Sequence, residues 1–296
     1  MAGAKELKAR MGGVRETKQI TSAMYLIAST KLRHARADLE KTRPYFDALR
    51  AEMTRLFRVS GDAKNRWLAG PHGETRTAGV RGVLAITGDK GLCGGYNMNV
   101  IRRAEALMKE APDAKLYVVG EYGRHYFQSY RTNMEEDFRF SASEPSLDAA
   151  RDICTRLLQN YGDKELNEIV LVYTDMHGAV GSEVVSARLL PLERETVGTG
   201  ETGAGYEFFP SLDEVIETVL HSYLSGYIYS AMVDSLCAEQ NARVNAMDAA
   251  SRNADELLSS LSLQLNRERQ SSITQEITEI SAGAKAQKRK KEGSLV

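Results

Sequence analysis

Proline is scarce in this sequence, and its placement is informative. The 296-residue chain has six prolines, at positions 44, 71, 112, 145, 191 and 210. Proline lacks a backbone donor and clashes with the preceding turn, so it interrupts or kinks most helices. The segments before Pro44 and after Pro210 contain none, and each can form one very long helix. Pro44 itself predicts a local kink.

Cysteine and histidine are also sparse. The chain has three cysteines, Cys93, Cys154 and Cys237, and five histidines, with no CxxC, HxxxH or HExxH spacing. These absences argue against a disulfide framework and a zinc site. No serine lies in a GxSxG elbow. The sequence therefore predicts no catalytic residue, no metal and no cofactor.

Long apolar runs are missing as well. No run approaches the roughly 20 residues of a membrane span, and the N-terminus lacks the apolar core of a secretory signal. We expect a protein that is cytoplasmic or peripheral on a membrane complex. The net charge of −1 gives no reason to expect a nucleic-acid partner. Residues 1–37 nevertheless carry eight Lys or Arg against two Glu, which predicts either a solvated helix face or a basic surface for an acidic partner.

Both end segments show helical apolar spacing. In residues 1–58 the predicted seam is Leu7, Met11, Val14, Ile20, Met24, Ile27, Leu32, Ala35, Leu39, Phe46, Leu49, Met53 and Leu56. In residues 211–287, after an N-cap at Ser211, it is Val244, Met247, Ser251, Ala254, Leu258, Leu261, Leu265, Ile273, Ile277 and Ile280. A lone helix cannot bury such a stripe. We expect the segments to pair as a long antiparallel coiled coil in which the longer second helix overhangs. The basic tail, 288–296, is predicted to be disordered.

The middle segment, 78–205, alternates between strand and helix patterns. Strands are predicted at 83–86, 115–119, 134–140, 168–173 and 184–190, and helices at 99–110, 121–130 and 146–161. This alternation is typical of a mainly parallel, Rossmann-like α/β domain. Residues 60–79 and 196–205 have loop composition.

A glycine-rich loop follows the first strand, where nucleotides often bind in α/β folds. Its glycines are Gly88, Gly91, Gly94 and Gly95. The spacing matches neither GxGxxG nor GxxxxGK followed by Ser or Thr. We therefore predict a tight structural turn rather than a phosphate site.

Three segments resemble the gamma subunits of bacterial rotary F-type ATP synthases. They are residues 15–24, the loop at 88–97 and residues 266–280, with the sequence NRERQSSITQEITEI. A chance match over the last segment is negligible. The resemblance extends along nearly the whole chain.

The resemblance implies a central-stalk rotor that is not itself catalytic. In that family the coiled coil fills an alpha3–beta3 hexamer, and the α/β domain sits with the epsilon subunit on the membrane c-ring. Ion flow turns ring and rotor, and the rotor drives the beta sites through different nucleotide affinities. The implied chain binds no ATP directly and lies peripherally on the cytoplasmic face of the cell membrane.

Site residues follow from the same resemblance. The implied rotor–stator contacts are Met24, Lys31, Arg33, Arg243, Arg269, Gln270, Thr274 and Glu279, and the implied c-ring or foot contacts are Tyr206, Glu207 and Phe209. The chain departs from the family pattern at Tyr25, where Glu is common, and at Phe209, which replaces an acidic residue. Two other hypotheses stay open at this point: a static coiled-coil adaptor, and a flavodoxin-like α/β protein with helical arms.

Overall fold

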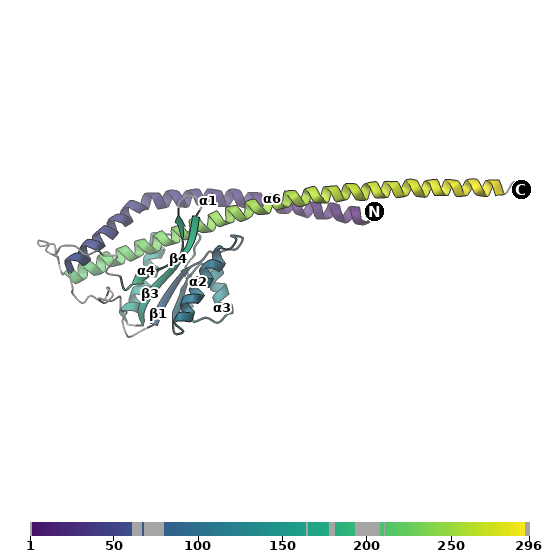
Figure 1. Cartoon of the computed structure of the whole chain (residues 1–296). Helices are drawn as coiled ribbons and strands as arrows, with labels where there is room; N and C mark the ends of the chain where they lie inside the picture. The colour runs from purple at the N-terminus through teal and green to yellow at the C-terminus, as the bar shows by residue number, and fades with distance from the viewer. Residues whose placement is uncertain are drawn as a thin grey trace. The chain divides into compact units, whose positions relative to one another are not determined.

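The computed structural model describes residues 2–60, 67, 80–163, 165–177, 181–192, 208–209 and 211–293. The chain forms two compact units, one of residues 1–27 with 245–296 and the other of residues 28–244. Two long helices, α1 (Ala2–Ser60) and α6 (Leu212–Gly293), each contribute to both units (Figure 1). The predicted boundaries at 58 and 211 follow the ends of these helices, whereas the units divide each helix along its length.

The second unit is built on a four-stranded mixed sheet. Its strands are β1 (Val80–Ile86), β2 (Lys115–Val119), β3 (Leu166–His177) and β4 (Gly181–Leu190), in the order β2-β1-β3-β4. β1 pairs in parallel with β2 and β3, and β3 pairs antiparallel with β4. The sequence predicted these strands but made β3 and β4 too short. The parts that were missed carry few apolar residues: Gly181, Ser182 and Glu183 of β4 are exposed, and Thr174 and Asp175 of β3 are polar, so apolar content could not reveal them.

One predicted strand is wrong. Residues 134–140 form only two isolated bridges, Met134 with Leu116 and Phe140 with Val119. Glu136 and Asp137 turn the chain between the bridges, so no continuous ladder forms beside β2.

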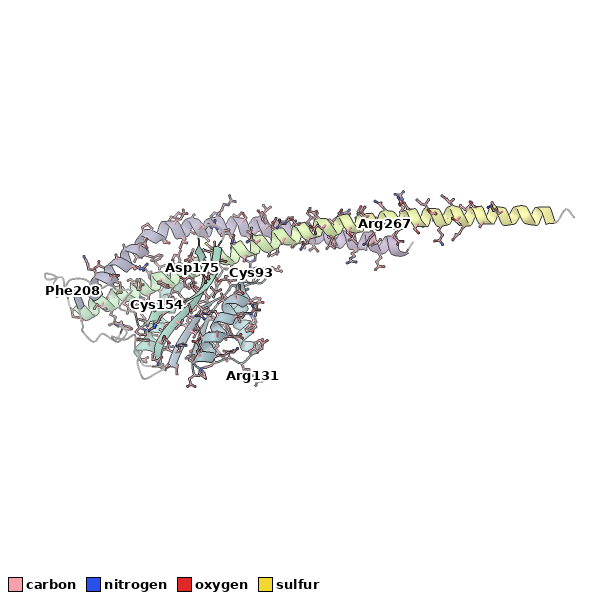
Figure 2. All side chains as sticks on the ribbon, viewed as in Figure 1. Cys93, Arg131, Cys154, Asp175, Phe208 and Arg267 are labelled. Carbon is pink, nitrogen blue, oxygen red and sulfur yellow. The ribbon has the colours of Figure 1, made fainter. Side chains whose placement is uncertain are left out.

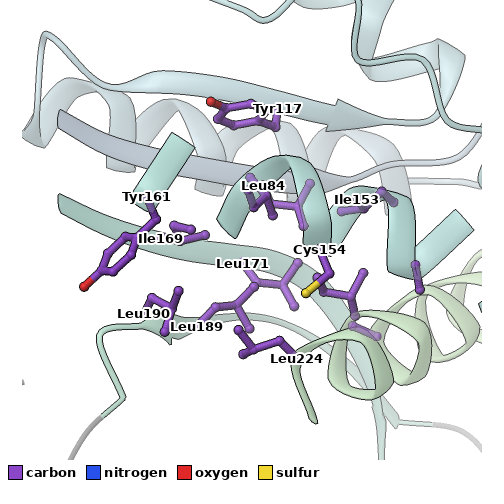
Figure 3. Close-up of a cluster of buried hydrophobic side chains, with 14 of the residues drawn as sticks. Leu84, Tyr117, Ile153, Cys154, Tyr161, Ile169, Leu171, Leu189, Leu190 and Leu224 are labelled. Carbon is purple, nitrogen blue, oxygen red and sulfur yellow. The ribbon is translucent and has the colours of Figure 1, made fainter. Parts of the chain in front are cut away.

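Helices cover both faces of the sheet. On one face, α2 (Tyr96–Glu110) and α3 (Glu121–Ser129) pack on a cluster that includes Val83, Ala85 and Val118. On the other face, α4 (Leu147–Gly162) and the first part of α6 pack on the alternate residues, among them Leu84 and Ile86. Figure 3 shows this second cluster, with Cys154 and Leu224 reaching toward the sheet. Adjacent residues of a strand point to opposite faces, so β1 is apolar from Val83 to Ile86 and is buried there on both sides.

In the first unit, α1 and α6 pack together. Lys18 pairs with Asp255 at 2.6 Å, and a Cβ added at Gly3 would lie 4.0 Å from Glu268. Residue numbers rise along one helix as they fall along the other, so the helices are antiparallel. All seven α6 positions predicted between Val244 and Leu265 are buried or half-buried. The two helices also pack together within the second unit. Phe46 of α1 lies so close to α6 that a Cβ added at Gly226 would be 2.5 Å from the Phe46 ring.

The predicted seam of α1 is partly wrong. Ile20 and Ile27 are 61% and 59% exposed, whereas Thr21 and Ala28 are buried. The buried stripe instead continues from Met11 in steps of three and four residues. Small side chains occupy the contact, and the larger isoleucines one position away remain on the surface.

The far end of α6 is a single helix. Ile273, Ile277 and Ile280 are exposed by 46%, 59% and 72%, as the predicted overhang requires. α6 continues to Gly293, so the beginning of the tail predicted to be disordered, 288–296, is helical. Lysine and arginine are good helix formers and are favoured at helix C-termini. Residues 294–296 lie outside the described part. No helix among the described residues is both long and apolar enough to span a membrane.

Candidate functional site

The glycine loop joins β1 to α2 at the carboxyl end of β1. The chain leaves β1 to form β2 on one side and later returns to form β3 on the other. This is the switch point where doubly wound α/β folds commonly bind ligands. The loop contains two residues with left-handed backbone, Leu92 at φ 61° and Gly94 at φ 56°.

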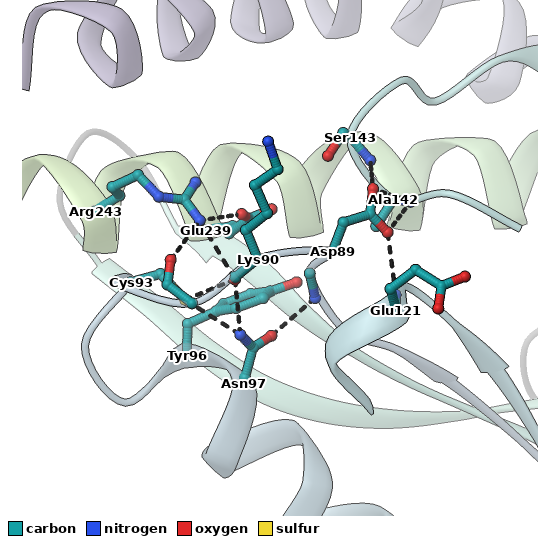
Figure 4. Close-up of polar contacts among 12 residues, drawn as sticks. Asp89, Lys90, Cys93, Tyr96, Asn97, Glu121, Ala142, Ser143, Glu239 and Arg243 are labelled. Atoms are coloured by element: carbon teal, nitrogen blue, oxygen red, sulfur yellow. Dashed lines mark hydrogen bonds and ion pairs between the residues drawn. The ribbon is translucent and has the colours of Figure 1, made fainter. Parts of the chain in front are cut away.

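Two polar side chains hold the loop in shape. Asn97 accepts a hydrogen bond from the Gly88 N–H at 2.8 Å and donates one to the Lys90 carbonyl at 3.2 Å. The Asp89 carboxylate accepts from the Ser141 hydroxyl at 2.7 Å and from the backbone N–H groups of Glu121, Ala142 and Ser143. Figure 4 shows both sets of contacts. Burial by itself would raise the pKa of Asp89, but the hydrogen bonds it accepts outweigh burial and lower that pKa.

The outer side of the loop is closed by α6. Glu239 is 2% exposed and lies so near the loop that a Cβ added at Gly88 would be 2.9 Å from its Cδ. Arg243, one helical turn farther along, pairs with Glu239 at 2.6 Å and donates to the Gly91 carbonyl at 3.0 Å. Burial raises the pKa of the Glu239 carboxyl, although the Arg243 guanidinium opposes the rise.

The contacts with α6 make the glycine loop unsuited to binding phosphate. A buried carboxylate lies against Gly88, where a phosphate-binding loop would need donors and positive charge. Gly88 is required because α6 approaches so closely, rather than because a ligand does. Among the described residues, no group of three or more His, Cys, Asp or Glu side chains could hold a metal ion.

Arg243 lies in a different environment from the other implied contact residues. The resemblance implied that it faces a partner, but its side chain is only 10% exposed, and its guanidinium is occupied by Glu239 and the loop carbonyls. Its role in this chain is to join α6 to the glycine loop. Sequence reasoning gave no role to Glu239, Asp89 or Asn97, and the only available signal was the i,i+4 spacing of Glu239 and Arg243 on α6.

The other implied rotor positions are accessible. Lys31, Arg33, Arg269, Gln270, Thr274 and Glu279 are exposed, and Met24 is half-buried. Thr274 donates to the Gln270 carbonyl at 2.9 Å, and Glu279 accepts from Gln275 at 3.0 Å. These contacts stay within one helix, so the side chains remain free to meet a partner surface.

At the implied foot, two neighbouring phenylalanines behave differently. Phe208 packs against the large core cluster, whereas Phe209 is 93% exposed. Figure 2 marks Phe208 just before the start of α6. Tyr206 and Glu207 lie outside the described residues.

Comparison with known proteins gives one consistent result. A family described as ATP synthase matches residues 3–287. The chain is 37% identical to the ATP synthase gamma chain of Acetivibrio thermocellus over 97% of this chain and 100% of the relative. It is 32% identical to the sodium-ion-specific gamma chain of Acetobacterium woodii, over 95% and 97%.

Solved structures agree on the fold. The rotational-state-3 structure of Euglena gracilis mitochondrial ATP synthase contains a chain that matches with a TM-score of 0.69, at 16% identity, over 96% of this chain and 94% of that one. The Tetrahymena thermophila central stalk and c-ring structure matches with a TM-score of 0.60, at 22% identity, over 78% and 99%. The match in family, in length and in the arrangement of long helices around a mixed sheet places this chain in the ATP synthase gamma-chain family.

Proposed function

We propose that this chain is the central-stalk rotor subunit of a rotary ATP synthase and couples ion-driven rotation of a c-ring to conformational change at the catalytic sites of an alpha3–beta3 hexamer. The chain itself carries out no catalysis and binds no ATP. The observation that carries the proposal is the form of the two end helices. They pair antiparallel through a narrow stripe in which small residues such as Thr21 and Ala254 stand among larger ones such as Leu261, and α6 alone continues beyond the pair.

The proposed rod is an antiparallel coiled coil. A thin rod of this kind suits a central cavity, because small residues at its seam, such as Ala254, bring the two helix axes close together. The rod is also unequal on its two sides, since one helix ends before the other. Each orientation of an asymmetric rod can stabilise a different conformation of a surrounding site, which is the thermodynamic requirement for driving affinity changes by rotation.

The proposed contacts with the hexamer lie along the exposed side of the rod. Lys31 and Arg33 are exposed cations that suit an acidic loop of a beta subunit, with Met24 packed nearby. On α6, the hydrogen-bond donors and acceptors offered to the hexamer are the side chains of Arg269, Gln270, Thr274 and Glu279.

At the other end, we propose that the Rossmann-like α/β domain sits on the c-ring together with an epsilon subunit. Phe209, almost fully exposed, replaces a polar contact with an apolar one there, beside Tyr206 and Glu207. The chain would then be peripheral to the membrane, on its cytoplasmic face, through the complex.

Tethering tests the proposal. A new cysteine at Gln270, paired with one introduced on the facing beta-subunit loop, should stop ATP hydrolysis by the assembled complex on oxidation and restore it on reduction. A cysteine at Tyr130, on the surface of the α/β domain and 68% exposed, is the control and should leave hydrolysis unchanged. The native cysteines are all buried and do not interfere. A static adaptor would keep full hydrolysis when tethered at Gln270, and this result would refute the rotor proposal.

A further inference from the structure

The contact between α6 and the glycine loop has a role beyond local folding. We infer that Glu239 and Arg243 form a torsional latch, which fixes the rotation of α6 about its own axis at the point where the α/β domain releases it. The inference rests on the proposed rotor function and adds to it the residues that position the shaft.

The position of the pair supports this role. Residues 28–244 form one unit, and α6 passes into the other at Asn245. Arg243 therefore lies in the last turn of α6 that belongs to the unit of the sheet. Before the pair, α6 is held by apolar contacts, including Ala238 against Cys93 and Tyr96. Just beyond it, Asn245 is exposed.

The geometry suits resistance to twist. Apolar contacts are not directional, so they oppose the separation of two elements better than rotation of one against the other. Arg243 instead bonds the Gly91 carbonyl at 3.0 Å and the Glu239 carboxylate at 2.6 Å. Planar guanidinium groups donate in fixed directions. A turn of α6 would break the bond from Arg243 to the Gly91 carbonyl. Glu239 lies on the same helix and turns with it, so its part is to hold the guanidinium in the direction that this bond requires.

The surroundings of Glu239 argue against a purely stabilising pair. Its Oε2 atom is buried without a hydrogen-bond partner, and buried ion pairs are often no more stabilising than apolar residues of the same volume. Gly88 leaves no space for Glu239 to move toward the loop. The pair therefore fixes one rotational setting of α6, which is what a rotor needs where torque leaves its domain.

Torsional stiffness measured in the complex tests the latch. The alpha3–beta3 hexamer is fixed to a surface, and a bead is attached through a cysteine at Tyr130. The angular variance of the bead is recorded during nucleotide-inhibited pauses. Release of residues 239–244 would add about 9 Å of free helix to the roughly 36 Å between Asn245 and Glu268. Because compliance scales with free length, the rod's contribution to the angular variance should rise by about a quarter in Glu239→Gln/Arg243→Gln.

Three comparisons make the outcome clear. Asp148→Asn/Arg151→Gln removes an exposed pair on α4 and should leave the variance unchanged. Arg243→Lys keeps the charge but loses the fork of donors, and should give an intermediate value. Unchanged variance in the double Glu239/Arg243 variant, with normal ATP-driven rotation, would overturn the latch while leaving the rotor function intact. Failure of the unaltered chain to rotate would instead count against the rotor function itself.

Discussion

Gly120, between β2 and α3, gives the sharpest test of the fold. Its backbone has φ 95° and ψ 134°. A Cβ there would lie 2.3 Å from the Thr87 carbonyl oxygen and 2.8 Å from that of Gly88. Both neighbours are backbone atoms in the turn that holds the glycine loop, so neither can move without distorting it.

The expected loss of stability in Gly120→Ala can be worked from these contacts. An unfavourable backbone conformation costs on the order of 1–3 kcal/mol. Relief of the clash would also weaken the Gly120 N–H bond to the Phe140 carbonyl, 2.9 Å long, and a lost buried hydrogen bond costs about 1–3 kcal/mol. We therefore expect Gly120→Ala to lower the free energy of unfolding by about 4 kcal/mol.

Urea unfolding followed by tryptophan fluorescence measures this change. Trp67 is the only tryptophan, is 4% exposed and stacks on Tyr161 with ring centroids 5.7 Å apart, so its emission reports on the core. Gly162→Ala is the matched control, because a Cβ there meets nothing within 4 Å, and it should be neutral or stabilising by about 0.5 kcal/mol. A loss below about 1 kcal/mol in Gly120→Ala would refute the reasoning.

Three other predictions concern charge and titration. Arg243→Met should destabilise the chain by about 3 kcal/mol, because it leaves the buried Glu239 carboxylate unpaired. Arg252→Met breaks an exposed i,i+4 pair with Asp248 and should cost less than about 0.5 kcal/mol. Urea unfolding of the two variants measures the difference. The pKa of Asp89 is lowered in the folded chain, so its contribution to stability should fade as pH drops below about 4, and the deficit of Asp89→Asn relative to wild type should shrink there. Burial leaves Cys237 only 1% exposed and raises its pKa to about 11, so a variant with this cysteine alone should react with thiol reagents at neutral pH far more slowly than a variant with a single cysteine at Tyr130, and equal rates would contradict it.

Local pattern was enough to predict most of the elements. Apolar runs located β1 and β2, and the capping serines Ser146 and Ser211 gave the starts of α4 and α6, where each accepts a bond from a backbone N–H three residues on. Apolar periodicity did not distinguish between two adjacent rows of residues on the surface of α1, only one of which is buried. It assigned Ile20 to the α1 seam because isoleucine is apolar, but the close approach of the helices selects the smaller Thr21.

The sequence predicted that the glycine loop is a tight turn, but not that α6 packs against it. Its spacing excluded the known phosphate motifs, and this needed no structure. What occupies its outer side depends on Glu239, which is 151 positions after Gly88 in the sequence, and no local rule connects the two. The same distance hid the burial of Arg243, because a basic residue on a long polar helix normally suggests a solvent-facing surface.

The exposed isoleucines of the two long helices have a consequence for the cell. Ile20, Ile27, Ile273, Ile277 and Ile280 are between 46% and 72% exposed, and the last three are spaced by four and three residues, so they share one face of α6. A chain without its partners would leave these side chains open to solvent, and surplus copies would tend to self-associate or to be captured by chaperones. Balanced synthesis of this subunit with its partners is therefore a matter of solubility as well as stoichiometry.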